Sequence, residues 1–253
     1  MSTSMTLYHG DPNGPSFTVL AAVFEKGLQP DLVRLDLAAG ARHGLPSAQQ
    51  AEVAMSVEGE GPVLVVDGEA MSDSVFIACY LDDVGLGTAL RPSDPHGRWQ
   101  VMTWCRQMIE RTAPAAAYLG CQAHLPKADP AMIEKIGSTD LRARWEDIRA
   151  GRFADDKLRD SKSKIAQGVE QVEARLEGRH WLMGEFSIAD LESYAWLAGM
   201  VDVVASAFSG RPRTAAWMQR IKARPAVAKA LSLARVSKPT ACWAPGPEIN
   251  RWG

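Results

Sequence analysis

The stretch Pro62-Val63-Leu64-Val65-Val66-Asp67-Gly68-Glu69-Ala70-Met71 contains an Asp-Gly pair between two apolar runs. Asp-Gly in that position favours a tight turn, so the stretch predicts a hairpin of two antiparallel strands. Ser72-Asp73-Ser74 follows directly and offers side chains that can cap a helix. A helical pattern then continues through Leu81 toward Gly85, so the hairpin is expected to lead into a helix.

Upstream of the hairpin, strand and helix patterns alternate. Thr6–His9 predicts a short strand, Gly10–Pro15 predicts a turn, and Ser16 begins a helical pattern. A second strand is expected over Leu32–Leu37, followed by a weakly helical or loop segment over Arg42–Ala54. The order strand, helix, strand, helix or loop, hairpin, helix is typical of a thioredoxin-like α/β fold.

Strand signals disappear after Pro95. Five later segments have the apolar spacing of helices: Trp99–Gln122, Asp140–Leu176, Ser187–Ala207, Thr214–Arg224 and Ala226–Arg235. The segment before Pro95 is rich in Gly and Pro, and the tail from Val236 is irregular. We therefore expect a thioredoxin-like domain over residues 5–86, a linker over residues 87–94 and an all-α domain over residues 95–253.

Composition and charge exclude several classes of protein. The formal net charge is -2 and no basic stripe occurs, which argues against binding to nucleic acid or to a membrane surface. The N-terminus does not resemble a signal peptide, and the apolar stretch Tyr194–Phe208 is too short for a membrane span. The four cysteines are scattered without metal-ligand spacing, so we expect no metal and a cytoplasmic protein with reduced thiols.

The loop Asn13-Gly14-Pro15-Ser16 is placed between the first strand and the first helix. In a thioredoxin-like fold this helix N-terminus favours a thiolate. No cysteine occurs before Cys79, which argues against disulfide exchange. The hydroxyl of Ser16 could instead donate to a bound thiolate and lower its pKa. Alternatively Ser16 only caps the helix, in which case Asn13 or a backbone N–H would support the thiolate.

Two further segments are candidates for ligand binding. A proline at the entry of a central strand suggests a cis bond between Gly61 and Pro62, which would expose backbone groups to an extended peptide; the alternative is a plain strand-initiating proline. Asp73 and Ser74 could hold the ammonium and carboxylate groups of an amino-acid ligand at a helix start, or could simply cap that helix. Together with the serine loop, these segments would form three sides of one glutathione site.

The chain resembles a glutathione S-transferase over nearly its whole length. Ser187-Ile188-Ala189-Asp190 matches the family's capping box, which serves folding rather than catalysis, and Trp217 with Arg224-Pro225-Ala226-Val227 matches its closing pattern. The resemblance implies glutathione S-transferase architecture, glutathione as co-substrate and a dimer in which the glutathione domain of one chain meets the helical domain of the other.

Within that family the chain is similar to the bacterial beta-aryl etherases that break lignin dimers. The similarity lies in Leu7-Tyr8 with the serine loop, in Val23–Leu28 and in Leu90–Pro95. It implies a glutathione transferase that cleaves a beta-aryl ether by thiolate attack, releasing a phenol and a glutathione thioether. A general detoxifying transferase and a weakly catalytic or non-catalytic subunit of a heterodimeric etherase are the alternatives.

The chain departs from the family pattern in the glutathione half. Gly61 stands where valine is usual before the proline, Asp73 stands where glutamate is usual, and Ser56-Val57 replaces an Asn-Pro pair. Losing one charge-assisted contact would cost about 1.5–3 kcal/mol of affinity. These departures favour a weak site and therefore the supporting-subunit alternative.

The side chains that would bind the glycyl end of glutathione and the aromatic substrate are marked by weaker sequence signals. The resemblance places His43 or Arg42 near the glycyl carboxylate of glutathione, with plain solvent exposure as the alternative. The aromatic substrate would be held by one or two of the aromatic residues in the helical half, which are Trp99, Trp104, Tyr118, Trp145 and Trp196. The resemblance implies either a homodimer or a heterodimer with a related chain.

Overall fold

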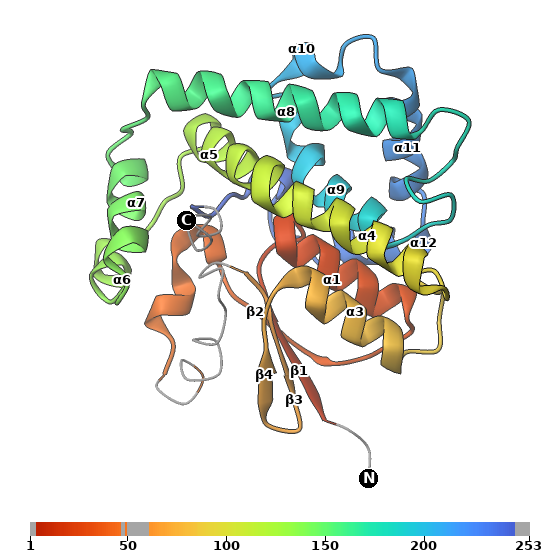
Figure 1. Ribbon diagram of the computed structural model, residues 1–253. Coiled ribbons are helices and arrows are strands. Elements are labelled where there is room, and N and C mark those ends of the chain that lie inside the picture. Colours follow the sequence, from red (N-terminus) through yellow and green to blue (C-terminus); the bar gives the residue numbers. More distant parts are fainter. Residues whose placement is uncertain (1–3, 47–48, 50–60, 246–253) are drawn as a thin grey trace.

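The computed structural model describes residues 4–46, 49 and 61–245, and Figure 1 shows a small sheet beside a larger group of helices. The sheet has four strands in the order β2-β1-β3-β4. They are β1 (Met5–His9), β2 (Asp31–Arg34), β3 (Val63–Val66) and β4 (Glu69–Met71). β1 is parallel to β2 and antiparallel to β3, and β3 is antiparallel to β4.

The predicted hairpin is confirmed as β3 and β4. Its turn residues Asp67 and Gly68 both have positive φ, at 49° and 90°. Two positive φ values are what a two-residue turn needs to match the twist of the strands, and an Asp-Gly pair tolerates them. The second strand is shorter than expected, because the side chain of Asp36 accepts a hydrogen bond from the Ala39 N–H and caps a 3₁₀ turn at that point.

Two helices cover one face of this sheet. Helix α1 (Gly14–Glu25) packs against α3 (Ser74–Val84) and against α9 (Ile188–Leu197) of the helical part. Nearly every residue of α1 is buried, because the sheet lies on one side of it and the helical part on the other. The first helix therefore lies between the two parts of the molecule.

The second part is built of helices, and its described residues add one isolated β-bridge between Met183 and Glu185. The helices are α4 (Pro95–Gln107), α5 (Ala113–Ala123), α6 (Pro130–Glu134), α7 (Thr139–Arg149), α8 (Asp155–Arg175), α9, α10 (Ala205–Phe208), α11 (Pro212–Lys222) and α12 (Pro225–Ser232). A π-helical turn, Met108–Thr112, joins α4 to α5. The predicted fold class, a thioredoxin-like α/β part followed by an all-α part, is confirmed.

Two predicted helices are interrupted in the structure. The expected helix Asp140–Leu176 is divided into α7 and α8 around Gly151, which has a φ of 66°. Glycine adopts that conformation without the steric cost that other residues have. The expected helix Ser187–Ala207 ends at Leu197, where a 3₁₀ turn begins.

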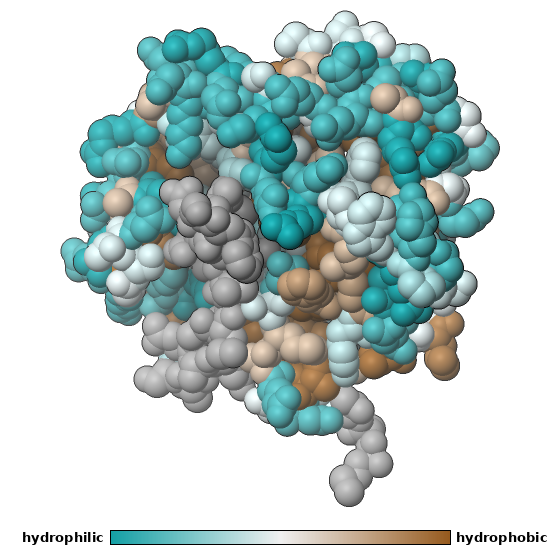
Figure 2. All heavy atoms as spheres, in the orientation of Figure 1, coloured by the Kyte–Doolittle hydropathy of each residue, from teal (hydrophilic) through white to brown (hydrophobic). Residues whose placement is uncertain are grey.

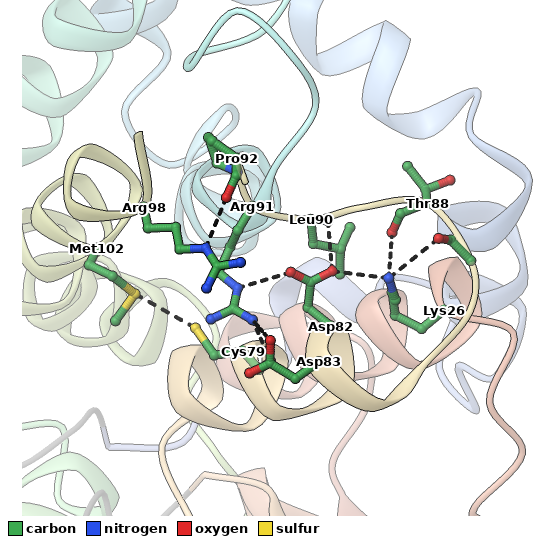
Figure 3. A network of polar contacts seen from close by, with 11 residues as sticks. Lys26, Cys79, Asp82, Asp83, Thr88, Leu90, Arg91, Pro92, Arg98 and Met102 are labelled. Atoms are coloured by element: carbon green, nitrogen blue, oxygen red, sulfur yellow. Dashed lines mark hydrogen bonds and ion pairs between the residues drawn. The ribbon is translucent and has the colours of Figure 1, made fainter. Parts of the chain in front are cut away.

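A buried charge network fixes the chain between the two parts (Figure 3). Lys26, just after α1, lies 3.0 Å from Oδ1 of Asp82 on α3 and donates to the carbonyls of Gly87 and Thr88. The other carboxylate oxygen of Asp82 is 2.9 Å from Nε of Arg91. Because the charges of this buried network are paired and hydrogen-bonded, it holds α1, α3 and the connecting segment in one arrangement.

The predicted capping box performs the folding role expected of it. The carboxylate of Asp190 is fully buried and accepts hydrogen bonds from the Ser187 N–H, the Leu182 N–H and Nε1 of Trp217. It therefore joins the start of α9 to α11 and to the preceding loop. No helix of the described residues is long and apolar enough to cross a membrane.

Candidate functional site

The loop between β1 and α1 is held closed by Ser16. Its side chain is 2% exposed, and Oγ accepts a hydrogen bond of 2.9 Å from the N–H of Gly10, at the other end of the loop. The hydroxyl hydrogen can still be donated to an acceptor beside the loop. Ser16 is not the helix cap, so that alternative interpretation of the sequence is wrong.

The cap of α1 is Asn13. Its Oδ1 accepts a hydrogen bond of 2.8 Å from the N–H of Gly14, while Nδ2 donates over 2.9 Å to the carbonyl of Cys242. Gly14 has a φ of 49°, a conformation that favours glycine. A capping asparagine followed by glycine therefore gives the loop its geometry, and the asparagine also binds the C-terminal segment.

A cavity that is open to solvent lies beside this loop, and its empty space, which includes open solvent, is about 530 Å³. Three of the predicted site residues, Asn13, Ser16 and Gly61, line it. The rest of its wall includes residues from distant parts of the chain, namely Leu37, Ala38, Ala117, Trp196, Cys242, Trp243 and Ala244. The structure thus brings the loop and the residue before Pro62 to one cavity.

The expected cis bond before Pro62 is not found. The described residues contain no cis peptide bond, so the bond between Gly61 and Pro62 is trans. Strand β3 begins one residue later, at Val63, which pairs with Tyr8. The missing N–H of Pro62 therefore lies before the strand and removes no hydrogen bond from the ladder, as for an ordinary strand-initiating proline.

Asp73 and Ser74 do not line the cavity, and both have structural partners. Oδ1 of Asp73 accepts hydrogen bonds from the N–H groups of Val75 and Phe76 and so caps α3. The φ of Asp73 is 72°, in a region that aspartate tolerates better than most residues do. The hydroxyl of Ser74 is fully buried and donates over 3.3 Å to Glu192.

His43 lies apart from the cavity, in a 3₁₀ turn after β2. Its Nε2 is buried and has no hydrogen-bond partner among the described residues, and Arg42 beside it is only 7% exposed. Solvent exposure, the alternative for this pair, is therefore wrong for Arg42, whereas His43 is partly exposed. Burial and the charge of Arg42 lower the pKa of His43 to about 4, so the imidazole is neutral at pH 7.

Of the five aromatic candidates, only Trp196 lines the cavity. Its ring packs against the start of α1, since a Cβ on Gly14 would come within 3.4 Å of it. The other four have different roles. Trp104 donates to Ser193, Tyr118 accepts from the Ala154 N–H, Trp145 is buried among residues of α6 and α7, and Trp99 is exposed.

The C-terminal segment, residues 236–245, supplies a wall that the sequence did not reveal. Trp243 is 3% exposed and stacks on Trp196, with ring centroids 6.1 Å apart and an interplanar angle of 28°. The ring fits because Gly120 and Gly199 lack side chains: a Cβ at either position would lie 2.6 Å or less from it. No local pattern links positions 120, 199 and 243, so sequence reasoning had no signal for this contact.

The lining of the cavity is both polar and aromatic. It includes the hydroxyl of Ser16 and the amide of Asn13 at the start of α1, together with the stacked indoles of Trp196 and Trp243. No cluster of residues in the described ranges could hold a metal ion. The arrangement suits a ligand that has one polar or anionic group and one apolar, aromatic part.

Three comparisons with known proteins agree with this geometry. Residues 150–225 match the glutathione S-transferase C-terminal domain family. The chain is 27% identical over 243 residues to Protein LigF of Sphingobium sp. strain SYK-6, covering 88% of this chain and 91% of that protein. It is also 26% identical to a glutathione S-transferase of Silene vulgaris, over 89% of this chain and 96% of that protein.

The likeness extends to the fold. The crystal structure of the beta-etherase LigF superposes with a TM-score of 0.80 at 24% identity, covering 91% of this chain and all of that chain. Together with the match of residues 150–225, this superposition agrees with the resemblance to glutathione S-transferases found in the sequence. Residues 150–225 are therefore a glutathione S-transferase C-terminal domain, and the chain as a whole has the glutathione S-transferase fold.

Proposed function

We propose that the chain is a glutathione transferase that cleaves a beta-aryl ether of a lignin-derived aromatic dimer. The observation that carries the proposal is the hydroxyl of Ser16, which lines the cavity at the start of α1 and has a hydrogen still to donate. The similarity to LigF, whose crystal structure is described as that of a beta-etherase, supports the choice of substrate.

We propose a cytoplasmic location, and domains spanning residues 5–86 and 95–253 with a linker over 87–94.

In this proposal glutathione is the co-substrate and its thiol is the nucleophile. An unperturbed thiol has a pKa of about 8.5, so most of it is protonated at pH 7. A hydrogen bond from Ser16 and the N-terminal dipole of α1 favour the thiolate and lower that pKa. The side chain of Asn13 lies beside the same helix start and is the second candidate for this role.

The reaction is a displacement at the carbon that bears the aryloxy group. The thiolate forms a carbon–sulfur bond while the carbon–oxygen bond breaks, and the electron pair leaves on the phenolate. The phenolate takes a proton from water, which balances the proton that the thiol released. The products are a phenol and a glutathione thioether, so no oxidant or reductant is consumed. The protein contributes thiolate stabilisation and alignment of the two reactants.

The remaining predicted glutathione contacts are Gly61, Pro62, Asp73, Ser74 and His43. Gly61 lines the cavity, whereas Pro62 does not, and the bond between them is trans. Asp73 would use its negative charge toward the ammonium group, whereas the hydroxyl of Ser74 is already engaged with Glu192. The neutral imidazole of His43 could offer a hydrogen bond, but no positive charge, to the glycyl carboxylate.

A general detoxifying transferase is the rival that shares this chemistry. It would use the same thiolate against other aromatic electrophiles, and the resemblance to plant glutathione S-transferases supports it. Comparing turnover of a beta-aryl ether dimer with turnover of a chlorinated nitrobenzene separates the two.

A dimer is the expected assembly. Phe76 on α3 and Trp99 on α4 are 63% and 61% exposed. Phe76 lies three residues before Cys79, and Trp99 lies three residues before Met102. The sulfur atoms of Cys79 and Met102 are 3.6 Å apart, so Phe76 and Trp99 are both close to the boundary between α3 and α4. Figure 2 shows apolar surface over α3, and exposed apolar groups of this kind mark interaction surfaces.

The test of the proposed function uses the purified full chain. Calorimetric titration with glutathione measures binding, and chromatography measures the phenol and the thioether released from a beta-aryl ether dimer. Ser16→Ala should lower turnover about tenfold or more while the protein remains folded. Ser161→Ala, which removes another buried serine far from the cavity on α8, should not. Full turnover by Ser16→Ala would assign thiolate support to Asn13 or to a backbone N–H.

A further inference from the structure

Glu192 is a fully buried carboxylate that the proposed chemistry does not use. It lies on α9, one helical turn before Trp196. Burying a carboxylate is costly unless hydrogen bonds compensate for the lost hydration. Its partners therefore indicate why the group is there.

Three donors from three helices meet at this carboxylate. Oε1 accepts a hydrogen bond of 2.6 Å from the indole N–H of Trp196. Oε2 accepts from the hydroxyl of Thr18 on α1 at 2.7 Å and from that of Ser74 on α3 at 3.3 Å. One oxygen thus binds the cavity wall, and the other binds the two helices whose first turns carry the proposed glutathione contacts.

Each partner lies next to a residue of the candidate site. Thr18 follows Ser16 by two residues, Ser74 follows Asp73 directly, and the Trp196 ring packs against Gly14. Neither Thr18 nor Glu192 lines the cavity, so neither can contact a ligand there directly. Any influence they have on binding must act through the position of the wall and of the two helix starts.

We propose that Glu192 is a positioning residue that fixes the Trp196 wall, the start of α1 and the start of α3 in the geometry that receives glutathione. The inference rests on the proposed function for the identity of the ligand. A hydrocarbon of similar size would fill the same space but would leave the indole N–H and two hydroxyls buried without acceptors. The carboxylate thus aligns three elements that belong to two different parts of the fold.

Two substitutions at this position separate alignment from packing. Glu192→Leu removes every acceptor. Glu192→Gln keeps an acceptor for the Trp196 N–H, and the hydroxyls of Thr18 and Ser74 can rotate to accept from the amide. Glutathione affinity should fall about tenfold or more in the leucine variant and stay within about threefold of wild type in the glutamine variant.

The chain offers a matched control in Glu173. This buried carboxylate on α8 accepts four hydrogen bonds from Arg213 and Thr214 and holds the start of α11, which is not part of the cavity. Glu173→Leu should lower the stability of the protein, because it also removes a buried carboxylate that accepts hydrogen bonds. It should nevertheless leave glutathione affinity within about threefold of wild type. Equal losses of affinity in the two leucine variants would overturn the inference, because both would then act through stability alone.

A second readout does not depend on glutathione. The indole N–H resonance of Trp196, assigned by its absence in Trp196→Phe, should move in Glu192→Leu and stay in place in Glu173→Leu. A folded Glu192→Leu protein with wild-type affinity and an unmoved resonance contradicts the inference. If the wild-type chain does not bind glutathione, the proposed function fails, and the resonance alone decides whether Glu192 fixes the wall.

Thr18→Val covers the case in which Glu192→Leu does not fold. It keeps the shape of the side chain and removes one donor, at a residue that does not reach the cavity. Weaker glutathione binding in this variant supports positioning through α1. Glutathione affinity within about threefold of wild type in a folded Thr18→Val protein contradicts it.

Discussion

The side-chain amide of Asn13 donates a hydrogen bond of 2.9 Å to the carbonyl oxygen of Cys242, although the two residues are 229 positions apart. The same side chain caps α1 through its other atom. The start of the first helix and the end of the described chain are therefore held by one residue, and the cavity lies beside it.

Asn13→Asp should separate these two roles. A carboxylate still accepts from the Gly14 N–H and suits a helix N-terminus, so stability should change by no more than about 1 kcal/mol. It cannot donate to Cys242, so amide hydrogen exchange in residues 238–244 should become faster. Asp94→Asn, a similar exchange at the cap of α4, is the control. Unchanged exchange in Asn13→Asp would mean that other contacts hold the segment.

Gly120→Ala should displace Trp243. Alanine within a helix is normally stabilising relative to glycine by about 1 kcal/mol. Here the added Cβ would lie 2.3 Å from the Trp243 ring, so we expect a lower melting temperature instead. The KM for an aromatic ether should rise while glutathione affinity is kept, because the displaced indole belongs to the aromatic wall. A more stable variant with an unchanged KM contradicts this role.

Local signals explain why much of the fold could be predicted. The Asp-Gly turn requires only two adjacent residues, and the capping box of Ser187 and Asp190 spans a single helical turn. The first strand and first helix are likewise defined by periodicity within a few residues. The side chain of Asp36 competes with the strand pattern at short range: it caps a 3₁₀ turn, so the observed strand is shorter than the predicted one.

Long-range contacts explain what the sequence could not show. Asn13, Ser16 and Gly61 were identified as site residues, and they line one cavity. The indole of Trp243 reaches that cavity only because two glycines in other elements leave space for it. The buried contacts of Glu192 likewise depend on how three helices pack. The Ser56-Val57 departure from the family pattern lies outside the residues that the structure describes.

Asp73→Asn should test whether charge at the start of α3 binds the ligand. Asparagine also tolerates a positive φ and caps helices, so the fold should be retained. If the carboxylate attracts the ammonium group of glutathione, affinity should fall about tenfold or more, since a charge-assisted hydrogen bond contributes about 1.5–3 kcal/mol. Titration calorimetry measures the change. Wild-type affinity in this variant would limit Asp73 to its capping role.

The stability of the protein should depend on pH through Glu192. Burial raises the pKa of Glu192 to about 7, and the charge of Asp73 adds to the effect. Cys105 also interacts electrostatically with Glu192, and burial raises the pKa of Asp190, two residues before Glu192, to about 6. A carboxyl group with a raised folded-state pKa stabilises the fold when protonated. That contribution is complete below about pH 4.5 and is lost as the pH rises toward 7.

The comparison of Glu192→Gln with wild type isolates this effect. His43 titrates in the opposite sense, because its lowered pKa makes stability rise with pH between about 4 and 6.5. Both proteins contain His43, so its contribution cancels in the comparison. The difference in unfolding free energy between the variant and wild type should be small at pH 5, where Glu192 is protonated, and should favour the variant at pH 8, where it is charged. The expected change is a few kcal/mol, at about 1.4 kcal/mol for each pKa unit. A difference that does not depend on pH contradicts the raised pKa.

The last prediction concerns assembly. If α3 and α4 form a dimer surface, Phe76→Glu should halve the mass measured by light scattering, because a carboxylate cannot be buried there without a partner. Leu125→Glu, at another exposed apolar residue beyond the end of α5, should leave the mass unchanged. A monomeric wild-type chain would contradict the assembly altogether.

If the chain forms a dimer, the composition of that dimer decides whether the chain works alone. The departures at Gly61 and Asp73 lie in the glutathione half, whereas the folding contacts of Asp190 are intact. A supporting subunit would show this combination, because its partner could supply the competent site while the architecture must be kept. The chain should be assayed alone and after mixing with a related chain from the same source. Full etherase turnover by the lone dimer contradicts a supporting role, and turnover that appears only on mixing establishes it.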